Sequence, residues 1–519
     1  MNLHGKEFGR PALWRAALGV VGLAALGKAI AFLREPAVAA ALGASVASDG
    51  YYLAVGLPFL VYNLAAVPFS LWVTARLAAA PNTRAEDSTV AFYRRMVVAA
   101  ALGAALAAFA AAELSRPLLR LYAPGLDGVR LEDAAALTRV GALALPALAL
   151  QAVCSAKLYS DRRFPIAYAW TAVGSVVGLA GVLTLAPRHG AAGAVWAFVL
   201  AAWTTAFGVL LSGWSSVHGT SLVQPVTWTT DFGPGMISRA IALQVFHQVS
   251  GLLVYSFGSQ LAAGGIGATL FASKIIMAVY EIIVLTAGVM LFPRIARLVR
   301  ERDDAGAGKQ IARAFDWLVP VMAALMVVLV LFRQEIVIVI YSHRAFEQRA
   351  ADLVTVALLG YVPSVLGLML IEIQHRILVL RGRLRGYIII VVAALSINWA
   401  MCSWLVPHLG ILGLTLGTSI GVLTAAVGLW IYAAHLLPHA GWLSLRALAA
   451  RSIPATALSL VIVGGARAWL GAPTSLGGRL ASIAAGTLTV ALLFFGTMLA
   501  LERRLPWSPK SGDQGVTAS

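Results

Sequence analysis

Ionisable side chains inside long apolar segments are the first candidates for chemistry in this sequence. Lys28 and Glu35 lie seven residues apart in the first apolar segment, and Arg34 precedes Glu35. Lys274 and Glu281 repeat the seven-residue spacing in a later segment. This spacing places both members of each pair on one face of a helix. The basic residues predict a positively charged, water-filled cavity for an anionic group such as a phosphate or diphosphate.

Asp49, at the start of the second apolar segment, joins Lys28, Arg34 and Lys274 as a candidate cavity residue, with Glu35 and Glu281 as supporting acids. The alternative interpretation is structural, because basic side chains also extend to an interface or pair with an acid. A charge at the centre of a membrane helix costs ~2.5–3.5 kcal/mol. We therefore favour binding for the three basic residues and leave both interpretations open for the acids.

The composition predicts the elements that carry these residues. The chain has 519 residues, of which 60% are hydrophobic and 12% charged, and its mean hydropathy is +0.84. A soluble domain has about 25% charged residues, so a soluble or disordered protein is excluded. Runs of about 20 apolar residues predict an all-α integral membrane protein with about fourteen transmembrane helices. The runs lie near 13–42, 50–75, 96–112, 134–156, 164–186, 191–213, 236–262, 265–292, 314–332, 350–375, 386–406, 410–434, 452–470 and 480–501.

The net charge of +17 is distributed between alternate connecting segments. Lys and Arg concentrate in the segments 6–15, 76–95, 157–163, 294–313, 376–385, 446–451 and 503–510, which hold 25 of the 39, whereas the intervening segments hold nine. By the positive-inside rule, this distribution predicts that both termini lie in the cytoplasm. The segment 214–235 departs from the pattern, because it contains neither Lys nor Arg. Nucleic acid is not an expected partner, since basic stripes with interleaved aromatic residues are missing.

Repeated features indicate two related halves. Tyr122 and Tyr341 each follow an apolar segment, and Pro146 and Pro363 lie within the next one. Pro-x-x-Gly recurs at 187–190 and 407–410. The nearly constant offset predicts pseudo-symmetric six-helix lobes over 1–220 and 221–440, two further helices over 441–505 and a disordered tail over 506–519.

Signatures of an enzyme or a cofactor site are missing from the sequence. There is no HExxH or GxSxG motif, and the two cysteines are far apart. The string at 306–310 lacks the first glycine and the Ser or Thr of a phosphate-binding loop. We therefore expect a protein that is not an enzyme and that uses no cofactor, metal or nucleotide. Its energy source would then be the membrane potential or a coupling ion such as Na⁺ or H⁺.

The segment 28–60, KAIAFLREPAVAAALGASVASDGYYLAVGLPFL, resembles the opening of the MurJ (MviN) lipid II flippase family, within the multidrug/oligosaccharidyl-lipid/polysaccharide exporter superfamily. The shared pattern is a basic residue, an Arg-acid pair, Leu-Gly, an Asp followed by aromatic residues, and Leu-Pro. The resemblance implies alternating-access transport of an undecaprenyl-diphosphate-linked saccharide, most simply lipid II, across the bacterial cytoplasmic (inner) membrane, in contact with membrane lipids. It also implies that Lys28, Arg34, Asp49 and Lys274 occupy cavity positions.

The sequence departs from the family pattern in the second segment. The family has a basic pair and then an acid after Leu-Pro, whereas this chain has Tyr62, Asn63 and Val67. We include Tyr62 and Asn63 as supporting candidates. This departure leaves two alternatives open, a flippase for another lipid-linked oligosaccharide and an ion-coupled exporter of drugs or other small molecules. A membrane glycosyltransferase and a non-transporting scaffold are the rivals from other classes.

Overall fold

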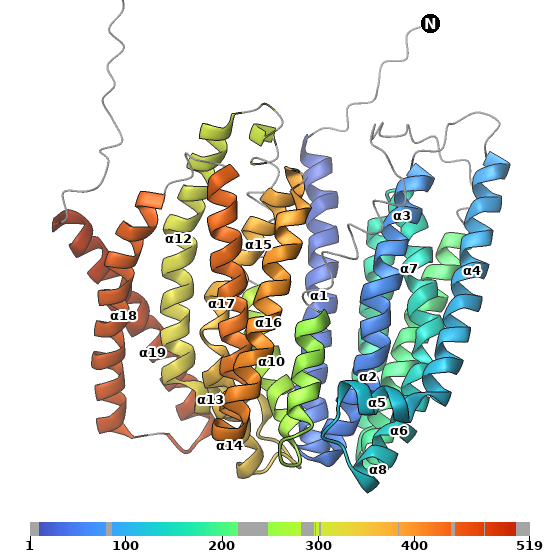
Figure 1. Ribbon diagram of the computed structural model, residues 1–519, viewed down its shortest axis with the longest axis horizontal. Helices are drawn as coiled ribbons and strands as arrows, with labels where there is room; N and C mark the ends of the chain where they lie inside the picture. The colour runs from blue at the N-terminus through green and yellow to red at the C-terminus, as the bar shows by residue number, and fades with distance from the viewer. Residues whose placement is uncertain are drawn as a thin grey trace, which may run out of the picture. The chain divides into compact units, whose positions relative to one another are not determined.

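The computed structural model describes residues 10–78, 86–215, 248–281, 295, 297–299, 301, 303–381, 383–436, 442–471 and 473–504 (Figure 1). The predicted tail over 506–519 and most of the segment 214–235 lie outside the described residues. The chain divides into two compact units. The first falls within Met1–Lys274, Tyr341–Val354 and Val406–Leu414, and the second within Ile275–Ile340, Thr355–Leu405 and Thr415–Ser519.

The described secondary structure is helical throughout, with no strand among the described residues. Nine described helices are long and apolar enough to cross a membrane, or ten if one bent pair counts as a single span. The predicted all-α membrane fold is confirmed. The helices of the N-terminal part are α1 (Arg10–Leu42), α2 (Val46–Val61), the π-helix η1 (Tyr62–Ala66), α3 (Val67–Ala78), α4 (Glu86–Glu113), α5 (Ser115–Tyr122), α6 (Gly128–Ala142), α7 (Ala144–Ser160) and α8 (Phe164–Ser215).

The remaining helices begin with a segment over 248–258. They continue with α10 (Gly265–Tyr280), α12 (Asp304–Leu331), α13 (Arg333–Tyr341), α14 (Gln348–Tyr361), α15 (Ser364–Leu380), α16 (Leu384–Leu409), α17 (Ile411–Leu436), α18 (Trp442–Leu470) and α19 (Leu476–Arg504). The division of the chain into lobes over 1–220 and 221–440 and a helix pair over 441–505 stays a prediction.

Two hydrogen bonds reproduce the internal repeat in three dimensions. The Tyr122 hydroxyl donates to the carbonyl of Leu53 at 3.0 Å, and the Tyr341 hydroxyl donates to the carbonyl of Phe271 at 2.9 Å. Each tyrosine ends a short helix, α5 or α13, that the hydropathy pattern does not predict. These matching tyrosine contacts support the interpretation that the chain contains two related halves.

The Pro-x-x-Gly segments also have matching backbone conformations. Gly190 has φ +58° and Gly410 has φ +55°, a region that glycine adopts at little cost. Gly190 divides α8 into two helical parts, and Gly410 separates α16 from α17. These positions are therefore the turns between the predicted spans.

Two predicted spans are not continuous helices. The span predicted over 134–156 breaks between α6 and α7 at Leu143, and the span over 350–375 bends by 48° between α14 and α15. Pro146 lies in the first turn of α7 and Pro363 directly precedes α15. Proline is favourable where a helix begins because it lacks the N–H that a helix interior requires. Pro146 therefore lies inside the apolar stretch Gly128–Ser160, as expected, and Pro363 lies at the bend of the pair α14 and α15.

Small residues allow the two parts of α8 to pack closely. Gly174, Gly178 and Gly181 face Ala197, Ala201 and Thr205 after the turn at Gly190. A Cβ atom at Gly181 would lie 2.7 Å from the Cβ of Ala197. Such small-residue faces let membrane helices approach closely. Helix α1 packs along α8 and continues through Pro36 to Leu42.

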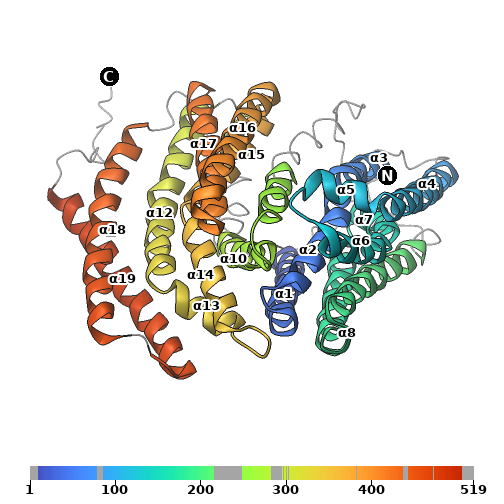
Figure 2. The ribbon, with the colours of Figure 1, turned by 60° about the horizontal axis from the view of Figure 1, so that its bottom comes forward.

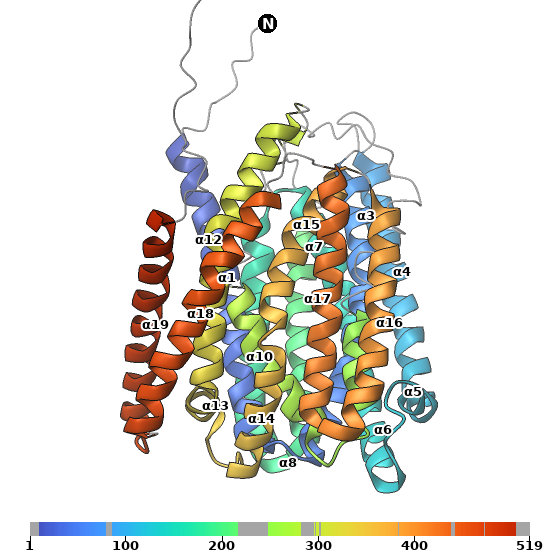
Figure 3. The ribbon, with the colours of Figure 1, turned by 60° about the vertical axis from the view of Figure 1, so that its left-hand side comes forward.

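The last two long helices pack against α12 in the second unit (Figures 2 and 3). Ala455 and Val463 of α18 join Val490 and Phe494 of α19 in one buried cluster with side chains of α12. Other apolar side chains of the pair are exposed, among them Val461 at 73% and Leu492 at 67%. An exposed apolar face is expected where a helix contacts lipid rather than water.

Candidate binding site

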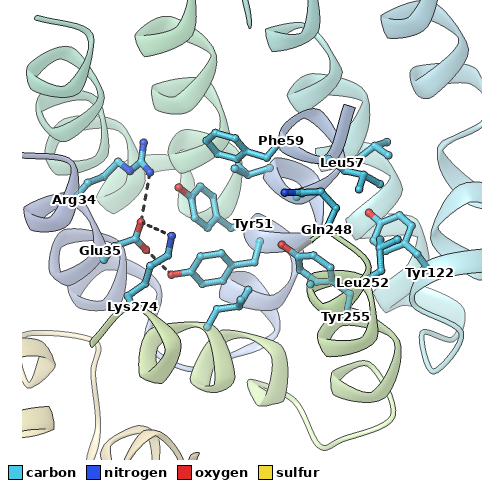
Figure 4. A pocket seen from close by; sticks show the side chains of 16 residues that line it. Arg34, Glu35, Tyr51, Leu57, Phe59, Tyr122, Gln248, Leu252, Tyr255 and Lys274 are labelled. Atoms are coloured by element: carbon cyan, nitrogen blue, oxygen red, sulfur yellow. Dashed lines mark hydrogen bonds and ion pairs between the residues drawn. The ribbon is translucent and has the colours of Figure 1, made fainter. Parts of the chain in front are cut away.

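Two basic side chains and one acid meet at a pocket in the first unit (Figure 4). Arg34 and Glu35 come from α1, and Lys274 comes from α10. The Nη2 atom of Arg34 lies 3.4 Å from Oε1 of Glu35, and Nζ of Lys274 lies 3.8 Å from the same oxygen. The Tyr52 hydroxyl donates a 2.8 Å hydrogen bond to Oε2 of Glu35. Glu35 therefore contacts both cations and is itself held by the Tyr52 hydroxyl.

The charges at this pocket do not cancel. Glu35 is 3% exposed, whereas the Lys274 side chain keeps 40% of its surface accessible. The lining contains two cations and one carboxylate, which leaves one excess positive charge. The cavity volume is about 150 Å³, well above the ~30 Å³ that one water molecule occupies. The site is therefore suited to a small anionic group that approaches Lys274 from the open side.

Lys28 and Glu281 are not among the residues that line this pocket. Lys28 is exposed on α1, two helical turns before the buried Glu35. Glu281 directly follows α10, is half-buried and belongs to the second unit. The structure thus brings Arg34, Glu35 and Lys274 together, and Lys28 of the same unit is not part of this group. A binding role for Lys28 and Glu281 stays a prediction.

Asp49 lies apart from the cationic pocket and holds the start of α10. Its Oδ2 accepts a 2.8 Å hydrogen bond from the N–H of Gly264, and its Oδ1 accepts a 2.7 Å bond from the N–H of Gly267. The Nη2 atom of Arg130 lies 3.8 Å from Oδ2. A carboxylate at a helix N-terminus satisfies backbone donors and interacts favourably with the helix dipole. Asp49 therefore positions α10, the helix that carries Lys274.

Replacing Asp49 with Ala is expected to destabilise the protein by about 1–3 kcal/mol, because the buried N–H groups of Gly264 and Gly267 lose their acceptor. Thermal unfolding of the detergent-solubilised protein measures the effect. Asp49→Asn keeps one acceptor oxygen and should lose less stability. Equal melting temperatures for the wild type and Asp49→Ala would contradict this structural role.

Tyr62 and Asn63 lie in η1, where the helix widens between α2 and α3. Both are half-buried and neither lines the pocket. The Asn63 side chain donates a 2.9 Å hydrogen bond to the carbonyl of Phe59, within its own helix. The π-helix places these residues on a stretch that regular helical periodicity does not describe. Their supporting role also stays a prediction.

Sequence reasoning missed several side chains of the pocket. Tyr51, Tyr52, Tyr255, Phe59 and Gln248 line it together with the charged residues. The Tyr51-Tyr52 pair after Asp49 was a visible signal, since the family resemblance includes aromatic residues at that point. Tyr255 and Gln248 carry no comparable signal, because an isolated polar residue in an apolar run has no particular spacing.

Comparison with known protein families identifies the family of this chain. Residues 38–477 match the model of the family described as lipid II flippase MurJ. The chain belongs to this family. Asp49 and Lys274 lie within the matched residues, whereas Lys28, Arg34 and Glu35 precede them.

Individual relatives of the MurJ family member agree with this assignment. A lipid II flippase MurJ from Burkholderia cenocepacia is 23% identical over 425 residues, which cover 79% of this chain and 81% of the relative. A solved structure described as lipid II flippase MurJ in an inward closed conformation matches with a TM-score of 0.73 and 15% identity, covering 94% of this chain and 98% of that one.

The fold is shared more widely than the family. An inward-facing multidrug resistance MATE family transporter of the MOP superfamily matches with a TM-score of 0.63 and 13% identity, covering 81% of this chain and 98% of that chain. The MurJ fold of this chain is thus a fold that multidrug transporters also use. Together with the apolar helices, family membership makes the chain a multi-pass inner-membrane protein of the flippase class.

Proposed function

We propose that this MurJ family member moves lipid II, an undecaprenyl-diphosphate-linked peptidoglycan precursor, across the cytoplasmic membrane by alternating access. The observation that carries the proposal is the paired cation site of Arg34 and Lys274 at an open pocket of a protein in this family. A diphosphate is the part of such a lipid that requires compensation of its charge inside a membrane protein.

The side chains suggest how the diphosphate is held. The Lys274 ammonium is accessible and only loosely paired, since 3.8 Å separates it from Glu35. The Arg34 guanidinium offers several N–H donors in a planar fork that matches phosphate oxygens. Glu35 keeps both cations in place when the pocket holds no ligand. A bound diphosphate would exchange part of the Glu35 pairing for charge-assisted hydrogen bonds to its own oxygens.

The energy source and the topology complete the proposal. We expect transport without a nucleotide and without chemistry on the lipid, driven by the membrane potential or by a Na⁺ or H⁺ gradient. About 2.3 kcal/mol is available for each charge moved across 100 mV. The positive-inside distribution supports a cytoplasmic location for both termini.

Reconstitution into vesicles tests the proposed function. The purified protein is placed in lipid vesicles that contain fluorescent lipid II, and the lipid that reaches the outer leaflet is quantified without nucleotide. Lipid II translocation above that of protein-free vesicles supports the proposal. Translocation only of another lipid-linked oligosaccharide, or export only of soluble organic cations, would replace it by one of the alternative functions.

Replacing Gly56 with Ala is expected to weaken lipid II binding a few-fold with little change in stability. A Cβ atom at this position would lie 2.5 Å from the Tyr255 hydroxyl oxygen, so the ring has to move within the pocket. The higher helix propensity of Ala, worth up to about 1 kcal/mol, offsets part of the strain. Binding to purified protein and thermal unfolding measure the two effects.

Gly103→Ala is the matched control for Gly56→Ala, because no atom lies within 4 Å of a Cβ at this position in α4. The control should bind lipid II like the wild type. Equal lipid II affinity of Gly56→Ala and the wild type would show that the position of Tyr255 does not matter for binding.

A further inference from the structure

The pocket has two chemically different ends. Arg34, Glu35 and Lys274 lie at one end, and Tyr255 and Gln248 lie toward the other, with Tyr51 between them (Figure 4). The charged end is the one assigned above to the diphosphate. The second end combines aromatic rings with polar groups, a pattern typical of sites that bind amphipathic ligands.

The tyrosine hydroxyls at the pocket are used in different ways. The Tyr52 hydroxyl donates to Glu35 and the Tyr122 hydroxyl donates to the Leu53 carbonyl, so both serve the protein itself. Among the lining residues drawn in Figure 4, no hydrogen bond or ion pair joins the hydroxyl of Tyr51 or Tyr255. The Tyr51 hydroxyl points toward the Arg34 side of the pocket, and the Tyr255 hydroxyl points into its interior (Figure 4). Tyr255 is half-buried and Tyr51 is 1% exposed, so the Tyr255 hydroxyl is the more accessible of the two to a ligand in the pocket.

The protein places Tyr255 close to α2. Gly56 leaves room for the Tyr255 hydroxyl against this helix, and the Tyr255 ring packs edge-on against Tyr122 with 5.9 Å between the ring centroids. Tyr122 is in turn fixed by its hydrogen bond to Leu53. Tyr255 thus presents a ring and a hydroxyl from a supported position, which is what a specific binding contact requires.

The chemistry of this end favours a sugar over the lipid tail. A pyranose ring has apolar C–H faces that pack on aromatic rings and hydroxyl groups that bond to phenols and amides. An isoprenoid chain would fill the same space but leave the hydroxyl of Tyr255 and the amide of Gln248 without partners, which is costly in a desolvated site. In a diphosphate-linked glycan the first sugar is bonded directly to the diphosphate, so it must lie next to the charged end.

We propose that Tyr255, Tyr51 and Gln248 form a subsite for the first sugar ring of the diphosphate-linked glycan. This inference rests on the proposed function, because it takes the Arg34–Lys274 end as the diphosphate site. The subsite lets the protein distinguish a glycosylated lipid from the sugar-free carrier lipid that shares its diphosphate and its tail.

Binding of two lipids to the purified protein in lipid nanodiscs tests the subsite. The probes are lipid II and undecaprenyl diphosphate, which lacks the sugar. Tyr255→Phe removes only the hydroxyl and should weaken lipid II binding about five- to tenfold, the range expected for one hydrogen bond. Binding of undecaprenyl diphosphate should stay within twofold of the wild type. Tyr168→Phe, in α8 and outside the pocket lining, is the matched control and should change neither affinity.

The outcomes separate the two proposals. A selective loss of lipid II affinity in Tyr255→Phe supports the sugar subsite. An equal loss for both lipids, or no loss for either, overturns the subsite while leaving the diphosphate site intact if the wild type binds undecaprenyl diphosphate. Failure of the wild type to bind either lipid overturns the proposed function and the subsite with it. An unchanged melting temperature of Tyr255→Phe shows that a selective loss does not come from unfolding.

Discussion

Lys274→Ala is expected to bind lipid II about tenfold to a hundredfold more weakly than the wild type and to lose translocation accordingly. The substitution removes an accessible cation and leaves the pocket without its excess positive charge. A hydrogen bond to a charged group contributes about 1.5–3 kcal/mol, which corresponds to this range of affinity. Glu35 retains its contacts to Arg34 and Tyr52, so we expect the fold to persist. Lipid binding and vesicle translocation measure the effect.

Two further variants separate charge at the pocket from charge in general. Lys274→Arg keeps the cation and should retain most of the affinity. Arg297→Ala removes an exposed cation, 65% accessible and paired with Glu301, that does not line the pocket. The Arg297→Ala variant has the same net charge as Lys274→Ala and should bind lipid II like the wild type. Equal losses in Lys274→Ala and Arg297→Ala would mean that only the overall charge matters.

The sequence predicts the membrane fold well because hydropathy and helix length respond to the same bilayer thickness. It does not predict the short helices α5 and α13, which are too short to register as spans. The one-residue break at Leu143 is also not predicted, although Pro146 follows it by three residues. The π-helix that begins at Tyr62 cannot be predicted from the sequence either, because its wider turn leaves the apolar composition of the segment unchanged.

The sequence predicts the charged residues of the site but not the other lining residues, because the site combines segments that are far apart in the sequence. Arg34, Glu35 and Lys274 stand out because charge inside an apolar segment is costly. The seven-residue spacing alone would place Lys28 with Glu35, yet Lys28 is exposed while Glu35 is buried. Which residues of a helix face enter a pocket depends on the partner helices. Tyr255 reaches the pocket only because Gly56, distant in sequence, leaves room for it.

A second charged cluster lies in the other unit. Arg467 of α18 forms an ion pair with Glu335 of α13 and donates to the carbonyl of Leu331 at the end of α12. Its guanidinium carbon lies 4.8 Å from the centre of the Phe332 ring. Glu335 is 2% exposed and the Arg467 side chain is 20% exposed. Arg467 therefore connects α18 to the junction of α12 and α13.

Arg467→Ala is expected to be the most destabilising single substitution considered, at about 3–5 kcal/mol, because it leaves the buried carboxylate of Glu335 without its cation. The contact over the Phe332 ring is lost at the same time. Thermal unfolding in detergent measures the change. Arg116→Ala is the matched control, because its partner Glu132 is about half exposed and such a pair contributes about 1 kcal/mol or less.

The double variant Arg467→Met with Glu335→Gln distinguishes an uncompensated charge from lost packing. If the buried charge is the cause, removing Glu335 as well should restore much of the stability lost in Arg467→Met, because apolar or neutral groups replace a buried ion pair at low cost. If the double variant is as unstable as Arg467→Met, the loss comes instead from the contacts of Arg467 with Leu331 and Phe332. In the first case the intact ion pair contributes little net stability and α18 packs without it, and in the second the bulk and hydrogen bonding of the arginine hold α18 in place.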